Sequence, residues 1–207
     1  VEFAFAGGSS QDPKDRAGLS YMAASLLDEG AGELDAAAFQ EKMERDAIQL
    51  QFRSDRDHFR GSLRTLKEKQ DGAFDLLRLA LTAPRFEPGA VDRIRAQVVS
   101  QLRREASDPT QIATEAWWAA AFPGHPYGMP QKGTQESVAL VKSDDLKAYV
   151  RRVLARDRLK VAVVGDIDPQ AAAAMLDRVF GALPAKGELA PVAPAAPAGL
   201  GRRTVVP

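Results

Sequence analysis

The chain contains 207 residues, of which 45% are hydrophobic and 27% are charged, a composition that is typical of a globular protein and excludes disorder throughout. At about 150 residues per domain, this length favours one large domain. Lys plus Arg and Asp plus Glu number 28 each, so the formal net charge is zero, and the absence of cysteine excludes disulfides, thiol nucleophiles and Cys-ligated zinc or iron–sulfur sites.

Strands and helices alternate in the first third of the chain. Alternating apolar side chains predict a strand over residues 1–6, which ends at a Gly-Gly-Ser-Ser turn. The helical spacing of Leu19, Met22, Ala23, Leu26 and Leu27 predicts a helix that begins after Gly18 and stops at Gly-Ala-Gly over 30–32. Residues 34–45 predict a second helix. After these helices, apolar and polar side chains alternate at every second residue, so residues 48–53 and 59–66 are predicted to pair as a β-hairpin.

Helices dominate the middle of the chain. Helical patterns that end before proline or glycine predict helices at residues 72–81, 88–106, 110–121 and 143–154. Residues 124–133 are predicted to form a loop, residues 159–164 a buried strand and residues 169–180 a last helix. This order predicts an α+β domain, a largely antiparallel sheet with helices packed on one face.

The last part of the chain has the composition of a linker. Residues 184–201 are rich in Ala and Pro, which favours a semi-extended tether. Residues 1–183 are therefore predicted to form the α+β domain, and residues 184–207 to lead to a second domain that this sequence does not include. Because the chain starts without Met, in a strand already under way, we expect a fragment of a longer polypeptide. No apolar run approaches the roughly 18 residues that a membrane span requires.

The chain contains few residues that indicate a particular chemistry. His58 and His125 have no second metal ligand at helical spacing, and no serine lies in a Gly-x-Ser-x-Gly elbow. No glycine-rich phosphate loop precedes a helix, and no long basic stretch suits nucleic acid. Trp117 and Trp118 point about 100° apart on a helix, so one is expected in the core and the other against a neighbouring domain or subunit.

Several stretches, taken in order, carry a family resemblance. They are Phe-Ala-Phe-Ala-Gly-Gly-Ser-Ser at 3–10 with Gly-Leu at 18–19, Phe-Pro-Gly-His-Pro-Tyr-Gly at 122–128, Gly-Thr at 133–134, Asp-Asp-Leu at 144–146, and Val-Ala-Val-Val-Gly-Asp at 161–166. Together they resemble the pitrilysin/insulinase family of zinc peptidases, which includes the mitochondrial processing peptidase and the core subunits of respiratory complex III. The resemblance covers nearly the whole chain and implies one α+β domain of that family.

The resemblance also indicates where active members hold zinc. They carry His-x-x-Glu-His in the helix after Gly-Leu, in which two imidazoles bind zinc and the Glu serves as general base, and a later Glu completes the site. In this chain the corresponding positions are Tyr21, Ala24, Ser25 and Gln101. A phenol, a methyl, a hydroxyl and a neutral amide neither hold zinc nor accept a proton from water. We therefore expect no metal, no cofactor and no peptidase activity from the chain alone.

The family implies a role for such a chain. Its members close a chamber from two halves, and in many cases one half carries zinc while the other is inert and helps to bind the peptide. The resemblance implies the first domain of an inert half, which pairs with a zinc-bearing family member or with itself and binds peptides. In active relatives an edge strand adds the substrate as an extra strand, and here the corresponding stretch is Gln51, Phe52 and Arg53.

Two other functions stay open at this point. One is a structural or assembly subunit, as in the respiratory core proteins, with no role in proteolysis. The other is a hydrolase whose metal site is rebuilt from His58 or His125 and carboxylates, although carboxylates at such spacing suit Mg²⁺ or Ca²⁺ better than a catalytic zinc. The candidate carboxylates are Asp28, Glu29, Glu105 and Glu115. The composition fits a bacterial source, and because bacterial paired members are often exported, the resemblance favours the periplasm.

Overall fold

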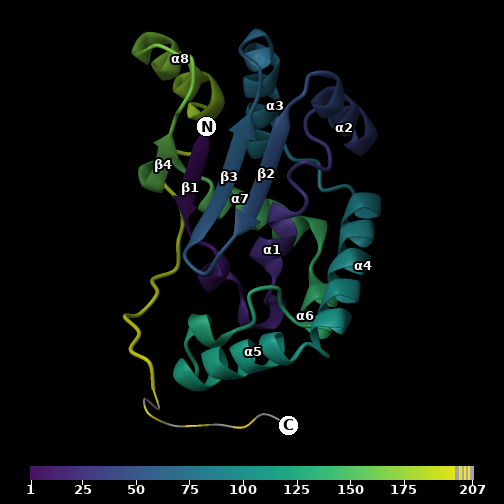
Figure 1. Cartoon of the computed structure of the whole chain (residues 1–207), viewed down its shortest axis with the longest axis vertical. Coiled ribbons are helices and arrows are strands. Elements are labelled where there is room, and N and C mark those ends of the chain that lie inside the picture. The colour runs from purple at the N-terminus through teal and green to yellow at the C-terminus, as the bar shows by residue number, and fades with distance from the viewer. Residues whose placement is uncertain (199–200, 202, 204, 206–207) are drawn as a thin grey trace.

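A four-stranded sheet forms the centre of the computed structural model, which describes residues 1–198, 201, 203 and 205 (Figure 1). The strands are β1 (Glu2–Ala6), β2 (Gln49–Ser54), β3 (His58–Arg64) and β4 (Leu159–Ala162). They follow the order β2-β3-β1-β4, and all three pairings are antiparallel. The predicted α+β class with an antiparallel sheet is confirmed.

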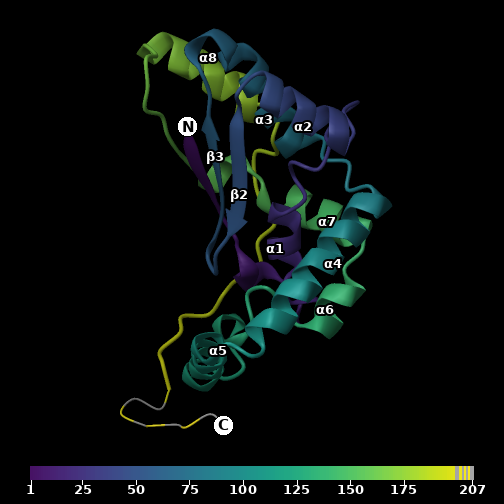
Figure 2. The same cartoon turned by 45° about the vertical axis from the view of Figure 1, so that its right-hand side comes forward.

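The helices lie on one side of this sheet, as Figure 2 shows with the sheet nearly edge-on. They are α1 (Leu19–Ala24), α2 (Ala36–Arg45), α3 (Gln70–Thr82), α4 (Pro88–Glu105), α5 (Pro109–Ala121), α6 (Gln135–Leu140), α7 (Ser143–Val153) and α8 (Pro169–Phe180). Helix α5 lies at the end of the molecule away from the sheet (Figure 1). Within the described residues, no helix is both long enough and apolar enough to cross a membrane.

The two faces of the sheet differ in chemistry, which explains the one-sided packing. Phe3 lies in register between Gly61 and Val161, and its ring is buried on the helix side. Gly61 has to be glycine because its Cβ would lie 2.1 Å from the Phe3 ring. On the opposite face, Arg53 and Lys160 are exposed. Helices therefore cover only the apolar face, where each buried large side chain contributes roughly 1.5–3 kcal/mol.

The structure corrects two predicted elements and contains one helix that the sequence did not predict. Helix α1 ends at Ala24, and Leu26 and Leu27 are buried in the turn that follows. The strand predicted to be buried over residues 159–164 stops at Ala162, and Val164 is 91% exposed, because β4 is an edge strand with one wet side. Helix α6 was not predicted, since six residues are too few to display a helical period.

Neither tryptophan lies in the buried core, so the prediction that one of them does is wrong. Trp117 is 54% exposed and Trp118 is half-buried. The physical reason is that α5 packs on the loop that follows it and not on the sheet, so only Ala121 of the helix is buried. That Trp117 faces a neighbouring domain or subunit stays a prediction.

The Ala/Pro-rich segment forms no helix or strand over residues 184–198, and it is bonded to the domain. Gln11 donates from Nε2 to the Ala190 carbonyl at 3.0 Å and accepts from the Ala190 N–H at 2.8 Å. Further along, the Ala198 N–H donates to the Ala121 carbonyl at 2.7 Å. The second domain predicted after this segment stays a prediction, and part of the predicted 184–207 linker lies outside the described residues, namely residues 199, 200, 202, 204, 206 and 207.

Candidate functional site

Two glycines fix helix α1 against the loop that carries Lys132. Gly18 has a φ of +90° and Gly133 a φ of +79°, both in the left-handed region that favours glycine. A Cβ on Gly18 would lie 2.4 Å from the Lys132 carbonyl oxygen, and one on Gly133 would lie 2.1 Å from the Ala17 carbonyl oxygen. The two backbones therefore approach as closely as they do only because both residues lack side chains, and Lys132 is held beside α1.

A buried carboxylate orients the first turn of α1. Asp12 accepts hydrogen bonds from the backbone N–H groups of Gly18 and Ser20, both at 3.0 Å, and from the Ser20 hydroxyl at 3.1 Å. Burial raises the pKa of the Asp12 carboxyl from 3.8 to about 7, against the opposing effects of these hydrogen bonds and of Arg152. The start of α1 is thus attached to the preceding loop by an interior polar cluster.

The side chains at two of the predicted positions contact each other. The Tyr21 hydroxyl on α1 donates to Gln101 Oε1 on α4 at 3.1 Å. Gln101 Nε2 donates in turn to Glu105 Oε1 at 2.8 Å, and Lys132 Nζ forms an ion pair with the same oxygen. A continuous chain of polar contacts therefore runs from α1 through α4 to the loop at Lys132.

The other two predicted positions do not join this chain. Ser25 keeps right-handed helical backbone angles at the end of α1, and its hydroxyl donates to the Tyr21 carbonyl oxygen at 3.0 Å. Ala24 is only 4% exposed, so its methyl group belongs to the core. The structure thus brings Tyr21 and Gln101 into contact, keeps Ser25 one turn from Tyr21, and points Ala24 into the interior.

The side chains at this place do not fit a zinc ion. Zinc in proteins is held by imidazoles, thiolates or carboxylates, and the phenol, hydroxyl and amide present here belong to none of these classes. Glu105 is the one carboxylate of the polar chain. Burial raises its pKa, but hydrogen bonds from Lys132 and Gln101 outweigh that effect and hold the pKa below its usual value. No group of three His, Cys, Asp or Glu side chains in the described part of the chain could hold a metal.

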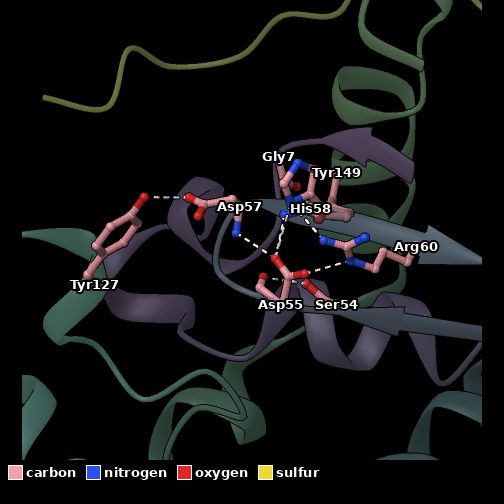
Figure 3. Close-up of polar contacts among 8 residues, drawn as sticks. All are labelled: Gly7, Ser54, Asp55, Asp57, His58, Arg60, Tyr127 and Tyr149. Atoms are coloured by element: carbon pink, nitrogen blue, oxygen red, sulfur yellow. Dashed lines mark hydrogen bonds and ion pairs between the residues drawn. The ribbon is translucent and has the colours of Figure 1, made fainter. Parts of the chain in front are cut away.

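The two histidines are engaged elsewhere. His58 Nδ1 lies 3.2 Å from Arg60 Nη2, and Arg60 Nε donates to Asp55 Oδ2 at 2.7 Å (Figure 3). His125 Nε2 lies 3.0 Å from the Ala193 carbonyl oxygen. Neither histidine is therefore gathered with the candidate carboxylates into a rebuilt metal site within the described residues.

The tip of the β2–β3 hairpin is rigidly held (Figure 3). Asp55 Oδ1 accepts from the backbone N–H groups of Asp57 and His58, both at 2.8 Å. Asp57 Oδ1 accepts from the Tyr127 hydroxyl at 2.6 Å, which ties the tip to the loop after α5. The hairpin tip is thus attached through Asp57 to the loop that follows α5.

The predicted substrate-binding residues Gln51, Phe52 and Arg53 lie on β2, which is an edge strand. In an antiparallel pair, hydrogen-bonded and non-hydrogen-bonded residue pairs alternate along the strands. The Asp55 N–H donates to the His58 carbonyl at 2.9 Å, so the hydrogen-bonded pairs between β2 and β3 are 53–60 and 51–62. The backbone N–H and C=O of Phe52 therefore point to the outer edge, where no further strand pairs among the described residues.

Near this edge lies a contact between two side chains that was not predicted from the sequence. The Arg56 guanidinium lies over the Trp118 ring, with its carbon 3.4 Å from the ring centroid. Both residues line a cleft of about 320 Å³ that Glu105 and Lys132 also border. The sequence places Arg56 in a predicted turn and Trp118 in a predicted helix, and nothing in their spacing indicates that the two side chains are in contact.

Two family descriptions match consecutive parts of the chain. The one described as insulinase (peptidase family M16) matches residues 1–135, and the one described as peptidase M16 inactive domain matches residues 141–207.

Individual relatives agree with these matches. A protein of Helicobacter pylori named non-peptidase homolog YmxG is 31% identical over 167 residues, which cover 81% of this chain and 39% of that protein. The mitochondrial-processing peptidase subunit beta of Blastocladiella emersonii is 28% identical over 99 residues, covering 48% of this chain and 21% of that protein. A crystal structure described as a peptidase M16 inactive domain from Pseudomonas fluorescens has a TM-score of 0.88 and 26% identity, covering 94% of this chain and 48% of the other. The chain therefore spans less than half the length of each relative.

Proposed function

Because the chain belongs to the insulinase (M16) family of peptidases, we propose that it is a non-catalytic member that pairs with a zinc-bearing member and binds peptide substrates with it. The family predicted from the sequence is confirmed by these matches. The name of the Helicobacter pylori relative, a non-peptidase homolog, supports the non-catalytic part of the proposal.

The observation that carries this proposal is the hydrogen bond between Tyr21 and Gln101. At the positions where active members hold zinc, a phenol and an amide bind each other, and the amide also donates to Glu105. Neither group supplies a zinc ligand of the usual kind, and Ala24 supplies no base that could take a proton from water. In the proposed pair, the zinc-bearing member therefore supplies the activated water.

The edge of β2 supports the peptide-binding part of the proposal. The outward backbone groups of Phe52 are free to pair with an extended peptide, and the exposed side chains of Gln51 and Arg53 flank them. Such pairing takes affinity from main-chain hydrogen bonds and selectivity from alternate side chains. It requires no metal, so the edge can serve a chain without a zinc site.

Peptide turnover by separate and combined chains tests the proposal. The partner is a co-purifying family member with an intact His-x-x-Glu-His helix, and a fluorogenic peptide is offered to each chain alone and to both. We expect cleavage only with both chains. Full activity of the partner alone would overturn the proposal in favour of a structural subunit, and turnover by this chain alone would overturn its non-catalytic part.

Scanning the peptide backbone tests the mode of binding. N-methylation removes one main-chain donor at a time, and in a strand only every second N–H faces the neighbouring strand. We expect methylation to weaken binding at alternate residues of the peptide, measured by fluorescence anisotropy with the full chain. Uniform sensitivity, or none, would show that the peptide does not add to β2.

A further inference from the structure

A cleft lies between α5 and the loop that follows it, close to the tip of the β2–β3 hairpin. Its volume is about 320 Å³, and its border includes Arg56, Glu105, Glu115, Trp118, Met129 and Lys132. Its border therefore combines the end of the polar chain that starts at Tyr21 with aromatic and apolar side chains, Trp118 and Met129.

Arg56 is presented to this cleft in a fixed orientation. Its Nε donates to the Tyr127 carbonyl oxygen at 3.2 Å, and its guanidinium plane is placed over the Trp118 ring. A guanidinium stacked on an aromatic face keeps its remaining N–H donors in its own plane, where they match the two oxygens of a carboxylate.

The charge of Arg56 has no matching partner in the described part of the chain. Its neighbour in the hairpin, Arg60, is bonded to Asp55, and Lys132 across the cleft is paired with Glu105, whereas Arg56 takes part in no ion pair. Partial burial lowers the pKa of the Arg56 guanidinium, and nearby Asp57 only partly offsets that effect. A cation held partly away from water without a counter-ion is costly unless an anion completes the site.

The surroundings select the kind of anion. Glu115 borders the same cleft, and its charge repels a dianion such as a phosphate group more strongly than a single carboxylate, whereas the charge of Glu105 is offset by its ion pair with Lys132. The apolar surface of Trp118 and Met129 suits the side chain or backbone that adjoins a carboxylate. A peptide supplies both features in one ligand.

We propose that Arg56 and Trp118 bind a carboxylate of a peptide, with the guanidinium holding its two oxygens and the indole packing against the adjoining residue. This inference rests on the proposed peptide-binding function. Arg56 follows β2 by two residues, since β2 ends at Ser54, and the hairpin tip points toward the end of the molecule where α5 lies (Figures 1 and 2). A peptide that pairs along β2 and continues past Ser54 therefore runs toward the cleft.

Four versions of one extended peptide test the inference with the full chain. They carry a free or an amidated C-terminus, each with or without an aspartate at the penultimate position, and affinity is measured by fluorescence anisotropy. We expect a carboxylate to tighten binding about 10- to 100-fold relative to the neutral peptide. Tightening by the free C-terminus identifies a chain end as the ligand, and tightening by aspartate alone identifies an acidic side chain.

Substitutions locate the effect. Arg56→Gln should abolish the difference between charged and neutral peptides while leaving the affinity for the neutral peptide unchanged, and Trp118→Ala should reduce affinity for both. Arg64→Gln is the matched control, because Arg64 is an exposed arginine of the same hairpin at the opposite end of β3. It should preserve the discrimination.

The outcomes separate this inference from the proposed function. If wild-type chain binds neutral and charged peptides equally, the carboxylate site is wrong while peptide binding stands. If no version binds, the peptide-binding function itself fails. If Arg56→Gln has a wild-type circular dichroism spectrum and still binds charged peptides more tightly than neutral ones, the inference is also overturned. If that variant does not fold, the comparison of charged and neutral peptides with the wild-type chain decides.

Discussion

At the scale of single residues, Tyr21 and Gln101 give the most direct test of the family alignment. Their side chains already touch across α1 and α4, and Ser25 lies one helical turn from Tyr21. The combined variant Tyr21→His, Ala24→Glu, Ser25→His and Gln101→Glu is expected to gain about one zinc per chain, because it supplies two imidazoles and a carboxylate at converging positions. Metal content after dialysis, measured by mass spectrometry, checks this.

The matched control keeps Gln101 and changes only the three positions near α1. It should hold zinc more weakly, since one carboxylate ligand is missing. Circular dichroism establishes that both variants are folded. A folded four-position variant without zinc would mean that these positions do not correspond to the metal motif of active members.

Asp12 provides a prediction about pH. Its pKa is about 7 in the folded chain against 3.8 ordinarily, so between these values the folded state holds a proton that the unfolded state has lost. The free energy of unfolding should therefore fall as the pH rises from about 4 to 7, by up to about 4 kcal/mol from this residue, and level off above 7. Urea denaturation at a series of pH values measures it.

Asp12→Asn removes this titration and leaves the other acidic groups in place. The difference between the two stability curves isolates Asp12, because carboxyls with lowered pKa values, such as Glu105, act equally in both proteins. The asparagine amide would face the backbone donors of Gly18 and Ser20, so the variant should also be less stable at acid pH. Parallel curves would contradict the raised pKa.

The residues of the site illustrate what a sequence can and cannot indicate. Resemblance to a family motif was sufficient to name Tyr21 and Gln101 as a pair to consider. The continuation of their contact to Glu105 and Lys132 depends on the close approach of Gly18 to the loop at Lys132, a long-range packing that leaves no periodic trace in the sequence. For the same reason, the contact between Arg56 and Trp118 could not be predicted.

At the scale of elements, the β2–β3 hairpin places two like charges side by side. Arg53 is the register partner of Arg60, and directly opposed like charges weaken a strand pair. We expect Arg53→Thr to raise the free energy of unfolding by about 0.2–1 kcal/mol, because it removes the repulsion and introduces a β-branched residue. Chemical denaturation in urea provides the measurement.

Gln51→Thr is the control for strand propensity. Gln51 is also exposed on β2, but its register partner is Ser62, so the substitution changes propensity without relieving any repulsion. Arg53→Thr should be the more stabilising of the two. Equal effects would show that Asp55, which is bonded to Arg60, already neutralises the arginine pair.

Long elements were predicted well because their periodicity is strong, and short or edge elements were not. Helix α8 has the predicted bounds of residues 169–180, where a capping aspartate and an N-terminal proline mark the start. Helix α6 is stabilised at its start by the capping box of Thr134 and Ser137. This signal is short, and it directly follows residues 124–133, whose composition predicts a loop, so the helix was not predicted. The apolar run after Ala162 favoured a longer β4 because hydropathy does not distinguish a sheet edge from its centre.

At the scale of the whole molecule, composition favoured a semi-extended tether over residues 184–201. The structure shows no helix or strand over residues 184–198, and composition did not indicate the path of this segment along the domain. The segment is bonded to Gln11, 179 positions earlier in the sequence, through both atoms of one amide group. This pairing imitates the two bonds that a neighbouring strand would form with Ala190. Gln11 is buried, with only 6% of the residue exposed, so water competes poorly for these bonds.

Gln11→Ala should therefore release the segment while leaving the sheet intact. Loss of two hydrogen bonds, each contributing about 0.5–1.5 kcal/mol, predicts roughly 5- to 150-fold faster amide exchange at Ala190 and its neighbours. Hydrogen–deuterium exchange of the full chain, read by mass spectrometry over residues 186–195, measures this directly.

His125→Ala is the control: on this segment it removes only the contact with the Ala193 carbonyl oxygen, and elsewhere it removes the hydrogen bond that His125 Nδ1 accepts from the Tyr127 N–H. Its effect should stay near Ala193, whereas Gln11→Ala should also free the stretch around Glu188, whose N–H donates to the Arg152 carbonyl oxygen. If Gln11→Ala leaves exchange at Ala190 unchanged, the segment is held by packing and not by the amide. A fixed path would then depend on Leu189, which lies against Gly7, and Leu189→Ala should produce the release that Gln11→Ala did not.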